Sequence, residues 1–220
     1  MNSIKTKRNF FDLFNTDYSI LKVKFNVNSD ETPTEVHIEN SLGKKTDTND
    51  LIELARICAD ERLKDFVGFY SDYDGFNLAT PKAPQNAVNK TLLRQLPASD
   101  IVKFTNQYVS GGQWAWTIDL NKTKAIYRRE SKWLAFAEVD GGPACLTIFL
   151  DGENAGNVFL LCPQPHFNTL KPIAKTYTDL LKRIAKDPAA FFKLTRAFVT
   201  LYGKDNQNYG YVPIEYIDNR

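Results

Sequence analysis

The feature of this sequence that most constrains its fold is a succession of short, largely apolar segments between residues 114 and 162. Each segment contains residues that favour strands, and three of the four connections contain Asn, Asp, Gly or Pro. Strands that follow one another through tight turns pair in antiparallel fashion. The sequence therefore predicts an antiparallel meander made of these segments: WAWTIDL, AIYRRE, WLAFAEV, ACLTIFL and NVFLLC.

One connection, DGENAG at residues 151–156, raises the question of a binding site, because acidic residues and glycines also hold metal ions and phosphates. An EF-hand calcium loop needs an oxygen donor at its fifth position and Glu at its twelfth, where this chain has Ala155 and Cys162. A phosphate loop ends in Lys and Ser or Thr before a helix, whereas Asn157 and Val158 open a strand. Gly supplies positive φ, and Asp and Asn bond nearby backbone, so we expect a turn between two strands.

A second β-rich section lies near the start of the sequence. Residues 20–27 alternate between apolar and polar side chains, and residues 35–38 are similar. Residues 29–33 between them contain Ser, Asp, Thr and Pro, so we expect a β-hairpin. The polar residues 43–49 then read as a linker.

A helix is predicted to begin at Asp50, because Asp50 can cap it and Glu53 completes a capping box. It is predicted to run to Phe69–Tyr70 and to end before the turn at residues 71–75. Three prolines between residues 79 and 110 predict an irregular section after that. The apolar stripe of the helix recurs at every fourth position: Leu51, Ala55, Ala59, Leu63 and Val67.

Two further helices are predicted towards the end of the sequence. The first has Pro172 in its first turn, where the missing N–H costs nothing. Asp187 caps the second, which is predicted to continue to Tyr202 and to end at Gly203. Residues 204–220 form a polar, aromatic tail. The apolar face of the first helix contains Ile173, Ala174, Tyr177, Leu180, Leu181 and Ile184.

Composition argues against several classes of function. The chain has 220 residues, of which 43% are hydrophobic, and this suits a domain of moderate size with a real core. Its net charge of +2 does not imply a nucleic acid or an anionic membrane as partner. The sequence contains no stretch of eighteen apolar residues, so no membrane-spanning helix is predicted. Its first residues do not resemble a secretory signal.

The candidate reactive residues show no catalytic or metal-binding pattern. Cys58, Cys145 and Cys162 are far apart in apolar surroundings, which predicts buried, reduced thiols in a cytoplasmic protein. His37 and His166 have no Cys or carboxylate at ligand spacing, although a dyad assembled through space stays open. The GxSxG, HExxH and GxGxxG motifs are absent from the sequence. We therefore predict no enzyme activity, no catalytic residue, no metal and no cofactor.

Aromatic residues give one hint of molecular recognition. A cluster of them surrounds Gly111–Gly112, and Trp and Tyr are enriched at the hot spots of protein interfaces. The alternative is that the alternation of strand residues buries part of these rings in the core. The candidate partner contacts are Tyr108, Trp114, Trp116, Tyr73 and Asp74.

The order of five segments carries a family resemblance. They are DFVGFYSDYDG at Asp65–Gly75, WLAFA at Trp133–Ala137, DGG at Asp140–Gly142, LTIFLDGENAGNVFLL at Leu146–Leu161 and the predicted helix at Ile173–Leu181. In this order, over about residues 50–187, they resemble the SUKH superfamily, which includes fungal cell-wall regulators and many bacterial immunity proteins. Asp74 stands where that family often has Asn.

The resemblance implies an α+β fold in which helices pack against a bent antiparallel sheet, without catalytic machinery. It divides the chain into an N-terminal β-hairpin extension at residues 1–48, a SUKH-like α+β domain at 49–187, and a C-terminal helix and tail at 188–220 packed on the same domain. Bacterial members typically neutralise a toxin, often a nuclease or a deaminase, by binding it. The residues that contact the toxin vary among members, so the resemblance assigns no binding site.

The resulting expectation is a cytoplasmic, non-catalytic protein-binding module, an immunity protein whose partner is a toxin domain. Two alternatives stay open. One is an intracellular regulatory scaffold that has no toxin partner, and the other is an enzyme with an unrecognised pocket. The sequence names neither the toxin nor an oligomeric state.

Overall fold

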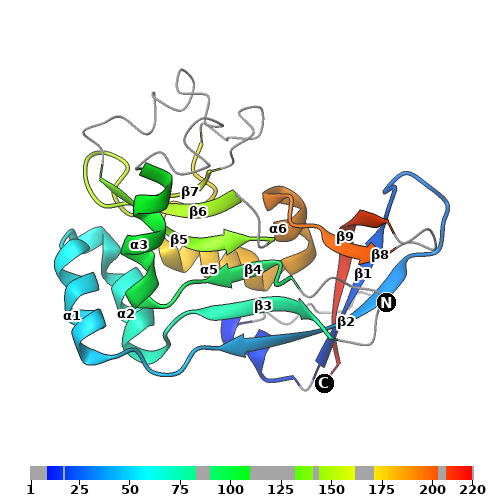
Figure 1. The fold of residues 1–220 in the computed structure, drawn as a ribbon, viewed down its shortest axis with the longest axis horizontal. Helices are drawn as coiled ribbons and strands as arrows, with labels where there is room; N and C mark the ends of the chain where they lie inside the picture. Colours follow the sequence, from blue (N-terminus) through cyan, green and yellow to red (C-terminus); the bar gives the residue numbers. More distant parts are fainter. Residues whose placement is uncertain are drawn as a thin grey trace, which may run out of the picture.

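The structure, a computed structural model, describes residues 9–16, 18–82, 90–109, 132–140, 144–161, 171–202 and 207–219. These residues form an open nine-stranded antiparallel sheet in the spatial order β7-β6-β5-β4-β3-β2-β1-β9-β8, against which five α-helices pack (Figure 1). The expected α+β class is therefore confirmed. The strands are β1 (Tyr18–Lys24), β2 (Thr34–Leu42), β3 (Phe76–Pro81), β4 (Leu93–Gln95), β5 (Trp133–Val139), β6 (Ala144–Phe149), β7 (Val158–Leu161), β8 (Val199–Tyr202) and β9 (Asn208–Asn219). The helices are α1 (Thr48–Ile57), α2 (Lys64–Asp72), α3 (Ala98–Val109), α5 (Tyr177–Lys186) and α6 (Pro188–Thr195), with the short 3-10 helices η1 (Phe10–Phe14) and η2 (Glu61–Leu63).

The antiparallel hairpin predicted near the start of the chain is present as β1 and β2, with Leu21 opposite Val36 and Ser19 opposite Ile38. These four side chains are buried, because every second residue of the hairpin faces the core. β2 also pairs with β3, so the hairpin is continuous with the rest of the sheet.

The meander is confirmed where the structure describes it. β5, β6 and β7 pair in sequence order and correspond to WLAFAEV, ACLTIFL and NVFLLC. The segments predicted as strands at residues 114–120 and 125–130 lie outside the described residues.

The last strand corrects two expectations. The polar tail after residue 204 contains a long strand, β9, which lies between β1 and β8. The second C-terminal helix does not reach Tyr202, because α6 ends at Thr195 and Arg196 closes it with a left-handed φ of 56°. Residues 199–202 then form β8, since pairing with β9 outweighs their local helical pattern.

The single helix predicted over residues 50–70 is two helices. α1 is capped by Asp47, whose carboxylate accepts a first-turn N–H at 2.8 Å. Cys58 then leaves the helical conformation with a ψ of 50°, and Asp60 caps the next turn by accepting the Arg62 N–H at 3.0 Å. Both helices turn their apolar residues towards the same core, which is why the pattern reads as continuous.

The starts of α5 and α6 differ in how well the sequence predicts them. α5 is capped by Thr176, whose hydroxyl accepts a first-turn N–H at 3.0 Å, so Pro172 is not in its first turn. Ile173 and Ala174 instead precede the helix and bond the backbone of Val158 on β7, where both are buried. The cap of α6 at Asp187 is confirmed by a bond of 2.9 Å to a first-turn N–H.

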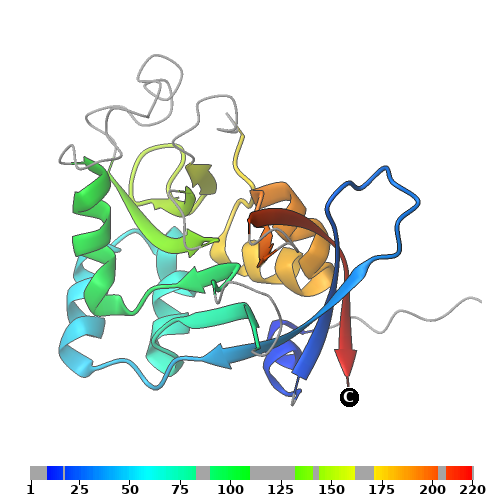
Figure 2. The ribbon, with the colours of Figure 1, turned by 45° about the vertical axis from the view of Figure 1, so that its right-hand side comes forward.

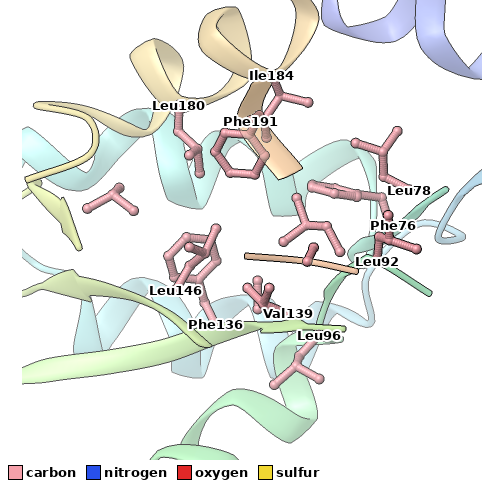
Figure 3. Close-up of a cluster of buried hydrophobic side chains, with 14 of the residues drawn as sticks. Phe76, Leu78, Leu92, Leu96, Phe136, Val139, Leu146, Leu180, Ile184 and Phe191 are labelled. Atoms are coloured by element: carbon pink, nitrogen blue, oxygen red, sulfur yellow. The ribbon is translucent and has the colours of Figure 1, made fainter. Parts of the chain in front are cut away.

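α3 and β4 occupy the section that the prolines predicted to be irregular. The Thr105 hydroxyl of α3 accepts the Ala135 N–H of β5 at 2.9 Å, which holds this helix against the strand. Figure 3 shows α3 on one side of β5, with α5 and α6 on the other. The sheet is therefore covered by helices on both faces around β5.

The main core lies between the sheet and α2, α5 and α6. Its centre is a group of buried rings in edge-to-face contact, with the Phe66 ring centroid 5.2 Å from those of Phe136 and Tyr177. Aliphatic side chains from the helices and strands fill the space around the rings. Figure 3 shows this packing for Phe76, Leu78, Leu92, Leu96, Phe136, Val139, Leu146, Leu180, Ile184 and Phe191.

Asn40, on β2, joins the two ends of the chain to the sheet. Its Nδ2 donates to the Leu13 carbonyl at 2.7 Å and to the Tyr216 hydroxyl at 2.6 Å. Its Oδ1 accepts the N–H of Ala79 on β3 at 2.8 Å. One amide side chain thus holds η1, β3 and β9 in a fixed relation.

Candidate functional site

Tyr73 and Asp74, two of the predicted partner contacts, lie in a turn that the fold uses for its own packing. The ring of Tyr73 is 5.4 Å from that of Phe11 and 5.7 Å from that of Phe69, and it is only partly exposed. The carboxylate of Asp74 accepts the first N–H of α3, that of Ala98, at 2.8 Å. These contacts give both residues a structural role, and their contact with a partner stays a prediction.

The same turn approaches its neighbours closely through two glycines. Gly75 has a φ of 84°, and a Cβ at this position would collide with the carbonyl oxygen of Gln95. A Cβ at Gly43 would collide with the carbonyl oxygen of Asp74. Because both positions admit only glycine, packing fixes the shape of this turn.

The other predicted contacts are only partly described. The backbone of Tyr108 belongs to α3, close to the C-terminal end of that helix. Trp114 and Trp116 lie outside the described residues, and so does the glycine pair between them and α3. The prediction that this aromatic group binds a partner therefore stays untested.

DGENAG at residues 151–156 is the turn that the sequence predicts, between β6 and β7. Gly152 and Gly156 have φ values of 69° and 82°, which they adopt without strain. Asp151 accepts the N–H of Lys132 at 3.2 Å, and so ties the turn to the start of β5. Among the residues that the structure describes, no group of three or more His, Cys, Asp or Glu side chains could hold a metal ion.

The described cysteines are buried, as the sequence predicts. Cys58 and Cys145 are buried and lie outside any disulfide, and burial raises the pKa of Cys58 to about 12. A thiol with such a pKa is protonated at neutral pH and is a poor nucleophile. His37 is exposed on β2, where its ring lies 5.4 Å from that of Tyr18. Cys162 and His166 lie outside the described residues.

Asp140, in the turn after β5, is a carboxyl group whose pKa the fold raises. It has a left-handed φ of 56°, and its N–H donates to the Leu92 carbonyl at 2.9 Å. The backbone N–H of Phe198, next to β8, favours the ionised carboxylate, while Oδ1 is buried and has no hydrogen-bond partner among the described residues. Burial raises the pKa of Asp140 to about 6, against the opposing influence of Lys90.

A second group of aromatic residues lies at the end of the sheet away from α1 and α2, where the β1–β2 loop projects from the molecule (Figures 1 and 2). Among the described residues, four large hydrophobic side chains are exposed, and three of them belong to this end. They are Phe25 (55% exposed) and Val27 (40%) on the loop and Ile214 (36%) on β9. The fourth, Ile52 on α1, lies elsewhere.

The rings at this end support one another. The Phe25 ring is 5.6 Å from that of Tyr209 and 5.8 Å from that of Tyr211, both on β9 and both partly buried. Strand pairing produces the contact, because Lys24 at the end of β1 lies opposite Val212 on β9. We call Phe25, Val27, Tyr209, Tyr211 and Ile214 the aromatic end.

Sequence reasoning missed the aromatic end, since its members come from opposite ends of the chain. Phe25 was only a residue of a predicted strand, and the β9 residues fell in a predicted tail. The available signal was the high density of Tyr and other strand-forming residues in Tyr209–Ile217, which favours a strand.

Comparisons with known proteins leave the family resemblance as a prediction. No protein-family model matches the chain, and no curated protein matches it either. In the part of the chain that the structure describes, no helix has both the length and the apolar character needed to cross a membrane.

Proposed function

We propose that this chain is a non-catalytic protein-binding module of the cytoplasm, an immunity protein that neutralises a toxin of nuclease or deaminase type by binding it. The observation that carries the proposal is the exposed apolar surface of the aromatic end. The α+β fold also agrees with the architecture that the SUKH resemblance implies.

The aromatic end has the physical character of a binding surface. The exposed part of the Phe25 ring favours association, because a partner can remove it from water. Phe25 is already held against Tyr209 and Tyr211, so binding would cost little side-chain entropy. Aromatic residues also dominate the energetics of known interfaces.

The chain would neutralise the toxin by covering part of its surface, not by a catalytic reaction. An interface of about 800 Å² per partner is enough for a specific complex. Such an area exceeds the aromatic end itself, so neighbouring residues would take part. Tyr108, Trp114 and Trp116 stay candidates for a further part of the interface.

The proposal is tested by capture followed by a growth assay. The tagged chain is used to capture proteins from a lysate of its native host, in parallel with Phe25→Ala/Tyr211→Ala and with the control Ile52→Ala, whose side chain is exposed elsewhere. Each partner captured in a one-to-one ratio is then expressed in a test bacterium, alone and together with this chain. We expect a partner that stops growth alone, growth restored by the wild type and the control, and no restoration by the double variant.

Other outcomes would overturn the proposal. A captured partner that is harmless when expressed alone would favour the regulatory scaffold. A toxic partner neutralised equally well by the double variant would remove the aromatic end from the interface. A purified chain that dimerises in sedimentation experiments, and loses this with the double variant, would assign the surface to self-association.

A further inference from the structure

Among the described residues, two lysines of β1 lie near the aromatic end, and both make contacts within the molecule. Lys22 lies 3.0 Å from the carboxylate of Glu215, and its backbone is opposite that of Glu35 in the β1–β2 ladder. Lys24 donates its Nζ hydrogen bond to the Ser29 carbonyl at 2.8 Å. Lys22 is therefore paired with a carboxylate, whereas Lys24 keeps its positive charge beside a neutral carbonyl.

The negative charges of the same region are exposed. Asp30 and Glu31 lie on the projecting β1–β2 loop, and Glu35 lies at the start of β2. From Phe25 to Glu39 the sequence contains no Lys and no Arg. The loop is thus acidic, although the chain as a whole carries a net charge of +2.

Aromatic faces and carboxylates together favour cationic ligands. The face of a Phe or Tyr ring attracts an ammonium or guanidinium group, and a nearby carboxylate pairs with the same group. Arg is suited to such a site because its planar guanidinium stacks on rings and also donates several hydrogen bonds. We infer that the aromatic end docks a protein surface rich in Arg and Lys. This inference rests on the proposed function and specifies the chemistry of the partner.

The inference is tested with peptides in place of the unidentified partner. Three short, fluorescently labelled peptides, an Arg-Gly repeat, a Glu-Gly repeat and a Ser-Gly repeat, are titrated against the full chain and followed by fluorescence anisotropy. We expect binding of the Arg-Gly peptide alone, weakened at high salt because the charges are exposed. Phe25→Ala should weaken it, because the ring provides the cation–π contact.

Charge reversal locates the binding site. Asp30→Lys/Glu31→Lys should weaken the Arg-Gly peptide by about fivefold or more, the effect expected for two exposed attractive pairs turned repulsive. The control Glu53→Lys/Glu153→Lys makes the same change of charge on α1 and in the β6–β7 turn, where both side chains are exposed. It should leave the affinity within about twofold, because these sites lie beyond the reach of screened charges.

The outcomes separate this inference from the proposed function. Equal binding of the three peptides, or equal loss with the control pair, would overturn a basic partner surface. Neither result would affect the growth assay, which tests neutralisation directly. If growth rescue is lost with Phe25→Ala/Tyr211→Ala but is unchanged with Asp30→Lys/Glu31→Lys, the neutralising interface stands and its basic chemistry is wrong.

Discussion

Two groups of aromatic rings in this molecule pack with similar geometry in different surroundings. In the core, the ring of Phe66 lies 5.2 Å from that of Tyr177, and both are buried. At the aromatic end, the ring of Phe25 lies 5.6 Å from that of Tyr209 and 5.8 Å from that of Tyr211, while Phe25 remains more than half exposed.

Ring geometry alone therefore does not distinguish a pair that stabilises the fold from a pair that can bind a partner. An edge-to-face contact adds only about 0.5–1.5 kcal/mol beyond the area that it buries. Most of the stabilisation comes from the apolar area removed from water, at about 25 cal/mol per Å². Folding has already removed the core rings from water. The exposed part of the Phe25 ring can still be removed from water by a partner.

The largest effect is expected for Phe66→Ala. Removing a fully buried ring leaves a cavity in the core and should lower the free energy of unfolding by about 3–5 kcal/mol. Equilibrium unfolding in urea, followed by circular dichroism, measures the change. A loss below about 1 kcal/mol would mean that the core collapses around the site, and the contrast between the two ring groups would then fail.

A smaller loss is expected for Tyr177→Phe, which keeps the ring and removes the hydroxyl. That hydroxyl donates to the Gln95 Oε1 at 2.8 Å inside the core, where the Gln95 Nε2 already has no partner among the described groups. Leaving the buried oxygen unpaired should cost about 1–3 kcal/mol in urea unfolding. The matched change Tyr211→Phe, at the aromatic end, should stay within about 0.5 kcal/mol. Similar losses for the two variants would contradict the prediction.

Asp140→Asn is predicted to change the pH dependence of stability. The folded chain holds the pKa of Asp140 at about 6, above its ordinary value of 3.8, so the folded state favours the proton. Its contribution is therefore fully present below about pH 4 and is lost as the pH rises through about 6.

Asn has nearly the same shape as Asp, does not ionise and tolerates a left-handed φ, so the variant should lack this loss. Because Asp140 is partly exposed, we expect Asp140→Asn to be more stable than the wild type at pH 7 by about 1 kcal/mol, and not at pH 4. Urea midpoints measured across this range test the sign. If the urea midpoints of the two proteins change with pH in parallel, Asp140 has its ordinary pKa in the folded chain.

The smallest effect on stability is expected for Phe25→Ala, which should lower the free energy of unfolding by less than about 1 kcal/mol because the ring is more than half exposed. The same variant should weaken capture of the partner by about tenfold or more, as for an aromatic hot spot. Urea unfolding and a titration of the captured partner measure the two numbers. A large loss of stability with unchanged binding would mean that Phe25 stabilises the fold, as the core rings do, and does not bind the partner.

The elements that the sequence predicts well are those determined by neighbouring residues. The β1–β2 hairpin and the turn at residues 151–156 follow from alternation and from turn-forming residues. The start of α6 follows from Asp187 as cap and from the proline after it. Each of these signals acts within a few residues, so no distant contact overrides it.

Elements that depend on distant contacts escape the same reasoning. One miss has a local cause instead: the helix predicted over residues 50–70 breaks at Cys58 and Asp60 caps a new turn, although the apolar stripe continues across the break. Val199 and its neighbours leave the predicted helix because β9 offers them a strand partner. α3 was missed because its N-terminal cap comes from Asp74, far away in the sequence.

The candidate site was the least predictable part. Phe25 meets Tyr209 and Tyr211 only because β1 pairs with β9, and no local pattern announces that pairing. Of the residues named from the sequence, Tyr73 and Asp74 lie in a turn held by its own packing. A surface built from opposite ends of a chain becomes visible only when the sheet order is known.

The place of β9 also has a consequence for how this protein is made. β1 leaves the ribosome early, but one of its two edges is paired by β9, with Tyr18 opposite Asn219. That edge has no partner until the last strand has been synthesised, so the nascent chain exposes a strand edge open to wrong pairing. The high contact order of this ladder should make its closure a slow, late step of folding. Chaperones that shield strand edges during translation should therefore raise the yield of this chain more than that of a protein whose strands all pair with sequence neighbours.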